Sequence, residues 1–303
     1  MSVKIVISLA SMGSRLPQLE QALRSLTVQS LQPDAILLHV SEEPHLADPG
    51  VSTQILYQNV PALSEFNNLI QVQFVANTGS YRKIIPALER VESPDSVIVT
   101  ADDDIFYPPF WLERLVENLD EVNTVTAYRC RKFSWLGKHL LPYENWNFLQ
   151  LPTDASFAAT ASHAVIPTGA GGIAYRRSYF SNDDPLDELM RLAPRQDDIA
   201  LRFLMLVKDV RVRWVPADRH TFRDALPIQE NAHVTLYQHN RRSSLLGFTA
   251  NDYAIRNVAR FLLPQATTLE TQMLLEQAVR GLPFHKALYQ RVRRVYWDMT
   301  SKS

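Results

Sequence analysis

The sequence is poor in cysteine, in long apolar runs and in net charge. Cys130 is the only cysteine among 303 residues, which excludes an internal disulfide and fits a reducing compartment. No apolar run approaches the roughly 20 residues of a transmembrane helix, so we expect any membrane contact to be peripheral. The formal net charge of −1 gives no overall field that would attract nucleic acid, and we expect no nucleic-acid partner.

Several catalytic motifs are missing as well. The eight histidines include no His-Glu-X-X-His pair, and the chain has no Gly-X-Ser-X-Gly segment, which argues against zinc proteases and serine hydrolases. No Gly-Lys-Ser/Thr follows the glycines at 169–172, so a Walker-type phosphate loop is not expected there. The content of 46 % hydrophobic and 21 % charged residues is ordinary for a soluble globular protein with one large or two modest domains.

The first third of the sequence alternates between buried-strand and helix patterns. Apolar runs at 5–10, 35–40, 71–75 and 96–100 predict strands, and leucines at helical spacing predict a helix over 16–26. Residues 1–10 lack the positive lead segment of a signal peptide, so we interpret them as the first strand. Residues 42–58 predict an irregular segment. The pattern as a whole predicts a βαβ opening and a parallel sheet.

The rest of the chain continues with mixed elements. Helices are predicted near 110–119 and over 195–206, and strands over 124–129 and 210–215. Beyond residue 241 the pattern is helical, with breaks at Pro264 and at 281–283.

Three adjacent carboxylates, Asp102, Asp103 and Asp104, follow the predicted strand at 96–100. Two carboxylates about 4 Å apart repel by roughly 4 kcal/mol at an effective dielectric near 20, so such a cluster implies a cation or a shared proton. The alternative is a helix N-cap, because Pro108-Pro109 opens a helical pattern. In that pattern Tyr107 holds the cap position, and we therefore favour a cation site.

The carboxyl ends of parallel strands share one rim of an open sheet, and ligands bind there. The loops at 11–15, 77–83 and 102–104 are expected at this rim. Gly79 before a helix N-terminus can offer backbone N–H groups to an anion, and Arg15 and Lys83 can supply positive charge. Gly79 alone predicts a turn, and Lys83 alone predicts a solvated side chain. Together with the carboxylates they indicate a phosphate and metal site.

Two later segments carry further candidates. Gly169, Gly171 and Gly172 precede a strand-like run and indicate a tight turn or a close approach of backbone to ligand. Asp197 and Asp198 begin the helix predicted over 195–206. One of the two aspartates can cap that helix, which leaves the other to face a cleft.

Aromatic residues gather in two places. Between 133 and 157 they can fill the core or stack on a sugar or base, and they are Trp135, Tyr143, Trp146 and Phe148. The segment 284–297 mixes basic and aromatic residues at helical spacing. It can lie on an anionic membrane surface or pack on the domain with a solvated basic face.

Five of these motifs, in this order, resemble the GT-A fold glycosyltransferases, and most of all the family 2-like bacterial enzymes that build surface polysaccharides. They are the segments 5–15, 77–83, 98–108, 167–172 and 196–199. The resemblance spans residues 4–240 and implies an α/β fold with a mostly parallel, Rossmann-like sheet flanked by helices and a helical C-terminal tail. It implies a domain over 1–242, divided near 107 and 108 into nucleotide-binding and acceptor halves, followed by a helical extension over 243–303.

The resemblance also implies roles for individual residues. Asp102 and Asp104 match the Asp-X-Asp motif that holds Mn²⁺ or Mg²⁺ on the diphosphate of the donor, and Asp103 matches a position by the ribose or the transferred sugar. His220 is implied as a third metal ligand, with His239 as the alternative. The donor, with a UDP-sugar as the leading candidate, is implied to contact Ser8, Ala10, Arg15, Asn77, Gly79, Lys83, Asp102, Asp103, Gly171 and Gly172.

Asp198, with Asp197 as the alternative, matches the general base of inverting family members. The sequence continues Asp-Asp-Ile-Ala where an aromatic residue often follows, which leaves the acceptor contacts open. The resemblance implies transfer of a sugar to a saccharide or lipid-linked acceptor, as in O-antigen or capsule synthesis, at the cytoplasmic face of the membrane. The alternatives are a metal-dependent sugar nucleotidyltransferase and a non-catalytic saccharide- or nucleotide-binding module.

Overall fold

The first strands of the protein form a parallel sheet. We describe a computed structural model, which defines residues 3–46, 48–119, 123–218 and 249–281. Strand β1 (Ile5–Ala10) pairs in parallel with β2 (Ala35–Val40) and β4 (Val97–Ala101), and β2 pairs in parallel with β3 (Ile70–Phe74). Every residue of β2 and of β4 is buried, as their continuous apolar runs predict. The predicted βαβ opening is confirmed.

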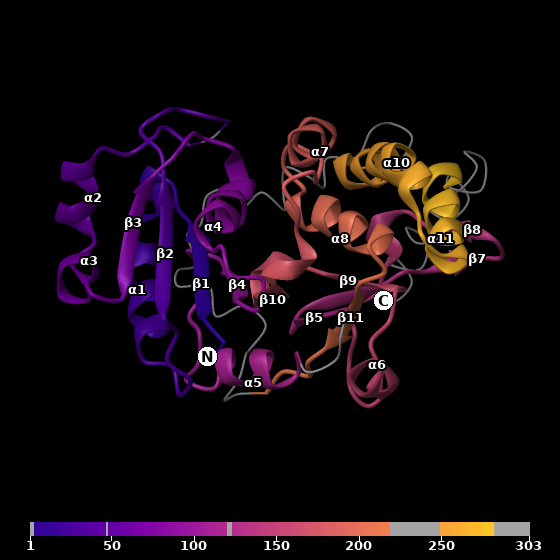
Figure 1. Ribbon diagram of the computed structural model, residues 1–303, viewed down its shortest axis with the longest axis horizontal. Helices are drawn as coiled ribbons and strands as arrows, with labels where there is room; N and C mark the ends of the chain where they lie inside the picture. The colour runs from indigo at the N-terminus through magenta and orange to yellow at the C-terminus, as the bar shows by residue number, and fades with distance from the viewer. Residues whose placement is uncertain (1–2, 47, 120–122, 219–248, 282–303) are drawn as a thin grey trace, which may run out of the picture.

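The second half of the chain extends the same sheet. Strand β10 (Ile173–Arg176) runs antiparallel between β4 and β5 (Thr124–Ala127), and β11 (Arg211–Trp214) pairs in parallel with β5. The seven strands lie in the order β11-β5-β10-β4-β1-β2-β3 (Figure 1). Two small antiparallel pairs lie outside this sheet, β6 (Cys130–Lys132) with β9 (Val165–Pro167) and β7 (Trp135–Leu136) with β8 (His139–Leu140).

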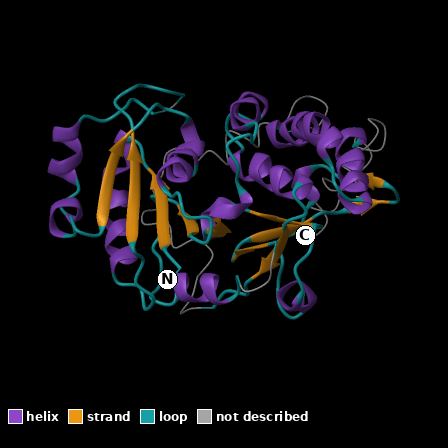
Figure 2. Ribbon diagram, viewed as in Figure 1, coloured by secondary structure: helices purple, strands orange, loops and turns teal. Residues whose placement is uncertain are grey.

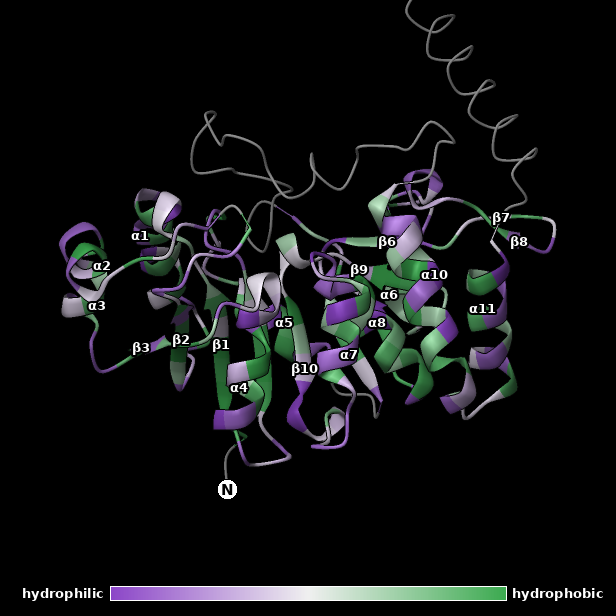
Figure 3. Cartoon of the chain, turned by 90° about the horizontal axis from the view of Figure 1, so that it is seen from above, coloured by the Kyte–Doolittle hydropathy of each residue, from purple (hydrophilic) through white to green (hydrophobic). Residues whose placement is uncertain are grey.

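Helices cover both faces of the sheet (Figure 2). Helices α1 (Leu16–Thr27), α2 (Thr53–Asn59) and α5 (Trp111–Glu117) share a buried cluster with Ile7 and Leu9 of β1. Helices α4 (Ile85–Arg90), α8 (Asp197–Val207) and α10 (Ala250–Leu262) share the opposite cluster with Val6 of β1. Side chains of a strand alternate between faces, so successive residues of β1 enter different cores. Figure 3 shows the hydrophobic residues concentrated on the central strands.

The remaining elements of the described residues are α-helices and 3-10 turns. The α-helices are α3 (Ala62–Glu65), α6 (Ala155–Ala159), α7 (Leu186–Leu192) and α11 (Leu269–Arg280). The 3-10 turns are η1 (Gly13–Arg15), η2 (Gly79–Lys83), η3 (Tyr143–Asn145), η4 (Gly169–Gly171), η5 (Arg177–Tyr179) and η6 (Leu263–Gln265). The turn η6 contains Pro264, so the predicted break between the C-terminal helices is confirmed.

Two local predictions were wrong. The segment 42–58 is not irregular throughout, because α2 begins at Thr53, where the Ser52 hydroxyl accepts the N–H of Ile55 at 3.4 Å. Helix α5 begins at Trp111 with Phe110 at the N-cap, and Tyr107 does not cap it. Tyr107 is instead fully buried, and its ring packs against Trp111 with 4.3 Å between centroids.

Some predictions lie outside the described residues. His220, His239 and the basic and aromatic segment 284–297 belong to the ranges 219–248 and 282–303 that the structure does not describe. In the part of the chain that it does describe, no helix combines the length and the apolar character needed to cross a bilayer.

Candidate active site

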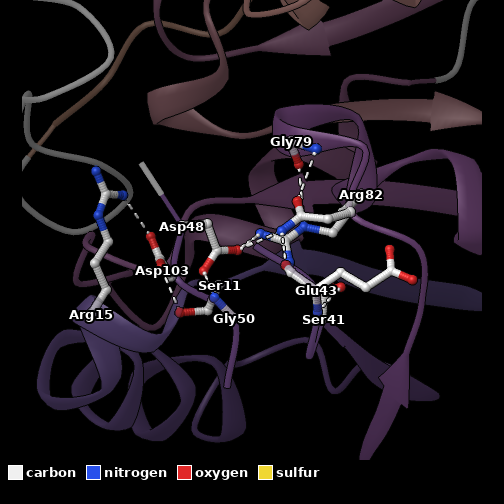
Figure 4. Close-up of polar contacts among 10 residues, drawn as sticks. Ser11, Arg15, Ser41, Glu43, Asp48, Gly50, Gly79, Arg82 and Asp103 are labelled. Atoms are coloured by element: carbon white, nitrogen blue, oxygen red, sulfur yellow. Dashed lines mark hydrogen bonds and ion pairs between the residues drawn. The ribbon is translucent and has the colours of Figure 1, made fainter. Parts of the chain in front are cut away.

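The predicted rim forms at the carboxyl ends of β1 and β4. Ser11 and Arg15 follow β1, and both contact Asp103, which follows β4 (Figure 4). The Ser11 hydroxyl donates to Asp103 at 2.6 Å, and Arg15 Nη1 donates to the other carboxylate oxygen at 2.9 Å. The same Arg15 nitrogen lies 3.1 Å from a carboxylate oxygen of Asp104. The prediction that the loops 11–15 and 102–104 meet at one rim is confirmed.

Lys83 joins the acidic cluster to the second half of the chain. Its ammonium lies 3.2 Å from Asp102 and 3.2 Å from Asp197 at the start of α8. Burial opposes the charged form of Lys83, but the two carboxylates outweigh it and raise the pKa of Lys83 well above its ordinary value. Lys83 is therefore a permanent cation between Asp102 and Asp197.

The three adjacent aspartates differ in access to solvent. The side chains of Asp102 and Asp104 are 28 % and 26 % exposed, whereas that of Asp103 is 5 % exposed. Burial raises the pKa of Asp103, against the lowering effect of Arg15 and Ser11. Burial together with the charges of Asp103 and Asp102 raises the pKa of Asp104 to about 6, although Arg15 opposes this shift. Asp102 and Asp104 are thus the two carboxylates that an incoming ion can reach.

Asp198 lies next to the Lys83 bridge and is only partly exposed. Burial and the charge of Asp197 raise the pKa of Asp198 to about 7, while Lys83 lowers it. One of its carboxylate oxygens accepts the N–H of Ile199 at 2.8 Å. Gln196 holds the N-cap position of α8, so neither aspartate takes the capping role that the sequence left open. A carboxyl group with such a pKa can accept a proton near neutral pH.

The glycine loop that contains η4 closes over this cluster. A Cβ on Gly169 would lie 2.8 Å from Lys83 Nζ and 3.8 Å from Asp102 Oδ1. Gly172 has a positive φ of 84°, and a Cβ there would lie 2.5 Å from the ring of Trp111. At both positions a side chain would be too close to its neighbours, so glycine is favoured there. Gly169 lies against the Lys83 ammonium, and Gly172 lies against the buried ring of Trp111.

Tyr107 and Trp111 position the cluster, a role that the sequence analysis assigned to neither of them. The Tyr107 hydroxyl accepts the N–H of Asp102 at 2.7 Å, which fixes the backbone at the first aspartate. Trp111 Nε1 donates to the carbonyl of Gly171 at 2.8 Å and so holds the glycine loop. For Tyr107 the sequence offered a signal, because Tyr107-Pro108 belongs to the most specific motif of the resemblance. For Trp111 it offered no signal, because the residue that Trp111 contacts is 60 positions away.

Ser8, Ala10 and Asn77 were also predicted to contact the donor. Ser8 is fully buried inside the sheet, where its hydroxyl lies 3.4 Å from His39 Nδ1. Ala10 is the last residue of β1. Asn77 donates to the carbonyl of Glu43 at 2.8 Å and accepts the N–H of Gly79 at 3.3 Å, so it holds the loop after β2. These donor roles stay predictions.

A pocket adjoins the rim on the side of β2. It has a volume of about 460 Å³, and its wall is formed by Gly13, Glu42, Pro49, Gly50, Val51, Ser52 and Ile55. Gly13 belongs to the turn that carries Arg15, although Arg15 and the three aspartates do not themselves line the pocket. Within the described ranges, no three His, Cys, Asp or Glu side chains form a group that could hold a metal ion by themselves.

The arrangement is that of a GT-A type α/β protein, with a mostly parallel seven-stranded sheet, helices on both faces and a polar rim. TarS from S. aureus is similar in fold, with 14 % identity, a TM-score of 0.50 and coverage of 89 % of this chain and 41 % of TarS. The chain thus spans less than half of TarS. TarS 1–349 in complex with UDP gives 14 % identity, a TM-score of 0.49 and coverage of 91 % and 70 %.

The 4-diphosphocytidyl-2C-methyl-D-erythritol synthase from Anaerococcus prevotii is a further similar structure. It gives 13 % identity and a TM-score of 0.43, with coverage of 73 % of this chain and 92 % of that protein. No family model and no curated protein sequence matches the chain. At such low identities the likeness concerns the fold alone.

Proposed function

We propose that the protein is a metal-dependent, inverting glycosyltransferase that moves a sugar from a nucleotide-diphosphate sugar to a hydroxyl of a saccharide or lipid-linked acceptor. One observation carries the proposal. Lys83 lies 3.2 Å from Asp102 and 3.2 Å from Asp197, so the accessible carboxylates of the rim adjoin Asp198, a carboxyl group with a pKa of about 7. A metal-binding pair and a proton acceptor on one rim are the two functions that such a transfer needs.

The donor set at the rim fits a hard divalent cation. Asp102 and Asp104 offer partly exposed carboxylate oxygens, and burial together with the negative charges of Asp103 and Asp102 raises the pKa of Asp104. Mg²⁺ is usually bound through one or two carboxylates plus substrate phosphates, so a cage made of protein alone is not required. When bound, Mg²⁺ or Mn²⁺ supplies charge stabilisation to the leaving diphosphate.

The chain's own residues account for the other steps. Arg15 and Lys83 hold positive charge beside the expected diphosphate, and the pocket bordered by Gly13 and Gly50 offers room for the nucleoside. Asp198 takes the proton of the acceptor hydroxyl while that oxygen forms a bond to the anomeric carbon. The bond from that carbon to the diphosphate breaks, and the nucleoside diphosphate leaves with the electron pair. Attack from the face opposite the leaving group inverts the configuration.

Hydrolysis of a donor panel tests this function. We expect a divalent cation to accelerate the release of nucleoside diphosphate from one nucleotide sugar, with UDP-sugars tried first, and EDTA to abolish it. A sugar nucleotidyltransferase, the second candidate, would instead release pyrophosphate from a nucleoside triphosphate and a sugar phosphate. A binding module would retain the nucleotide and turn over neither substrate. Binding that is indifferent to EDTA would contradict the metal-dependent proposal.

The cellular context of the reaction is also a proposal. Synthesis of a surface polysaccharide at the cytoplasmic face of the membrane would supply a lipid-linked acceptor, with the segment 284–297 as the membrane contact. The division into a domain over 1–242 and an extension over 243–303 stays a proposal as well. Helices α10 and α11 nevertheless pack in the same buried cluster as α8, so they support the helix that carries Asp197 and Asp198.

A further inference from the structure

A buried ion pair joins two loops of the rim at a place that the proposed chemistry does not use. Arg82 Nη2 lies 2.7 Å from Asp48 Oδ2, and the two side chains are 4 % and 5 % exposed (Figure 4). Asp48 belongs to the loop between β2 and α2, and Arg82 belongs to η2 after β3. Both partners are removed from solvent, so removing either one leaves a buried charge without its counterion.

The carboxylate of Asp48 is fully engaged within the protein. Its Oδ1 accepts the N–H of Gly50 at 3.0 Å, and its Oδ2 also accepts Asn77 Nδ2 at 3.1 Å. The backbones of His45 and Asp48 exchange two hydrogen bonds of 2.9 Å each. With these partners and 5 % exposure, Asp48 anchors its own loop and does not present its carboxylate to a ligand.

The anchored loop forms one wall of the 460 Å³ pocket. Gly50 has a φ of +81°, and a Cβ there would lie 2.2 Å from the carbonyl oxygen of Glu42. A Cβ on Gly13 would lie 2.5 Å from the carbonyl oxygen of Gly50. The loop is therefore packed backbone to backbone against the turn that leads to Arg15. A displacement of Asp48 would change both the pocket and the approach to the acidic cluster.

Arg82 also has a direct link to the catalytic side of the rim. Its chain neighbour, Lys83, bridges Asp102 and Asp197 from the same 3-10 turn. Arg82 Nε donates to the carbonyl of Gly79 at 3.4 Å, which fixes the guanidinium within this turn. One short turn thus holds the pocket wall through Arg82 and the carboxylates through Lys83.

We propose that Asp48 and Arg82 are a positioning pair, which sets the shape of the nucleotide end of the donor site without touching the donor. The inference rests on the proposed function, because it assumes that a nucleotide occupies the pocket. Since the pair acts on the wall of the pocket, its loss weakens nucleotide binding and discrimination between bases more than it slows turnover at saturating donor.

Nucleoside diphosphate binding in four variants tests the pair. UDP, GDP, CDP and ADP are titrated with Mn²⁺ into the wild type, Arg82→Met, Arg82→Lys, Asp48→Asn and Lys208→Met. Lys208 is the matched control, because it pairs with Asp184 at 2.6 Å away from the rim. Hydrogen exchange of the amides in 41–52 reports the loop itself.

We expect Arg82→Met to weaken binding of the preferred nucleotide about tenfold or more. The ratio of its affinity to that of the second-best nucleotide should also become smaller. Arg82→Lys keeps the cation and should remain within roughly threefold of the wild type, as should Lys208→Met. Asp48→Asn keeps the size of the side chain and the contact with Gly50, and it serves as the test if Arg82→Met does not fold. Its affinity for the preferred nucleotide should fall roughly fivefold. Amides in 41–52 should exchange faster in the Arg82→Met and Asp48→Asn variants alone.

Wild-type affinity and base preference in a folded Arg82→Met variant would overturn the positioning role. So would equal losses in Arg82→Met and Lys208→Met, because they would indicate a general loss of stability. A wild type that binds none of the four nucleotides would overturn the proposed function as well, so the two failures are distinguishable.

Discussion

Asp102 and Asp197 lie on either side of one ammonium, each 3.2 Å from Lys83 Nζ, although 95 positions separate them in the sequence. Asp102 directly follows strand β4 of the parallel half, and Asp197 begins helix α8 of the second half. Lys83 therefore electrostatically couples the expected donor side to the expected acceptor side.

Asp104→Asn should weaken metal-dependent nucleotide binding. The substitution preserves the size of the side chain and removes one of the two accessible carboxylates, so affinity for a nucleoside diphosphate with Mn²⁺ should fall by roughly 10- to 100-fold. Titration calorimetry with and without EDTA measures the effect. Asp95→Asn, at an exposed turn, is the control. Unchanged Mn²⁺-dependent binding in Asp104→Asn would remove Asp104 from the metal site.

Asp198→Asn should keep donor binding and lose transfer. General-base catalysis contributes roughly 10²- to 10⁴-fold, so kcat should fall by that factor while the Kd of the nucleotide stays within about twofold. Single-turnover assays with the identified acceptor measure the effect, and Asp187→Asn on the exposed face of α7 is the control. Full transfer in Asp198→Asn would shift the role to Asp197.

Transfer should become faster as the pH rises through about 7. Burial and Asp197 raise the pKa of Asp198 to about 7, and the base works only in its deprotonated form, so kcat should be low at pH 5.5 and level off above pH 8. A pH profile of kcat at saturating donor and metal checks this. A profile that falls over the same range would indicate that the protonated carboxyl group is the active form.

Substitution of the two charged neighbours of Asp198 should move the midpoint of the pH profile of kcat in opposite directions. Asp197→Asn removes a negative charge that raises the pKa of Asp198, so the midpoint should fall. Lys83→Met removes a positive charge that lowers this pKa, so the midpoint should rise. Lys138→Met, at an exposed position, is the control for loss of a lysine. Shifts of the same sign in both variants would contradict the arrangement around Lys83.

The contribution of His39 to stability should fall as the pH drops below 6.5, whereas Asp104 and Asp198, whose pKa values are raised in the folded protein, contribute in the opposite direction. Burial lowers the pKa of His39 from 6.5 to about 4, so between these values the unfolded chain binds a proton that the folded protein excludes. The fully developed loss amounts to roughly 3 kcal/mol, since one pKa unit corresponds to about 1.4 kcal/mol. Urea unfolding at several pH values checks this. The free energy of unfolding of the wild type, taken relative to His39→Asn, should fall over this range, whereas its difference from His45→Asn, at an exposed position, should not change with pH.

Much of the fold could be predicted because its signals are local. The runs at 5–10 and 35–40 are buried strands, and the leucines of 16–26 face one core, as their spacing requires. The helix predicted near 110–119 is α5, but the capping role given to Tyr107 was wrong, because Tyr107 is buried in the core against Trp111. The start of α2 was hidden in a segment of low periodicity and depends on a single cap, Ser52.

The site, like the fold, has features that the sequence predicts and features that it does not. A strand end followed by three carboxylates, with basic residues after neighbouring strands, predicts a shared rim because parallel strands end on one side. Asp48 gave no signal, because its role comes from a buried contact with Arg82 that chain spacing does not encode. The choice between Asp197 and Asp198 was open in the sequence. In the structure Asp197 contacts Lys83, and Asp198 has the raised pKa.

The sequence by itself determined the parallel sheet, the order of its first elements and the gathering of Arg15, Lys83 and Asp102–Asp104 at one rim, because these follow from periodicity and strand direction. Tertiary structure alone decided which carboxylate pairs with which cation, which remain open to solvent and how the loop at 41–52 is held. Those properties depend on burial and on distances of about 3 Å between residues far apart in the chain, where both the loss of hydration and the attraction between charges vary steeply.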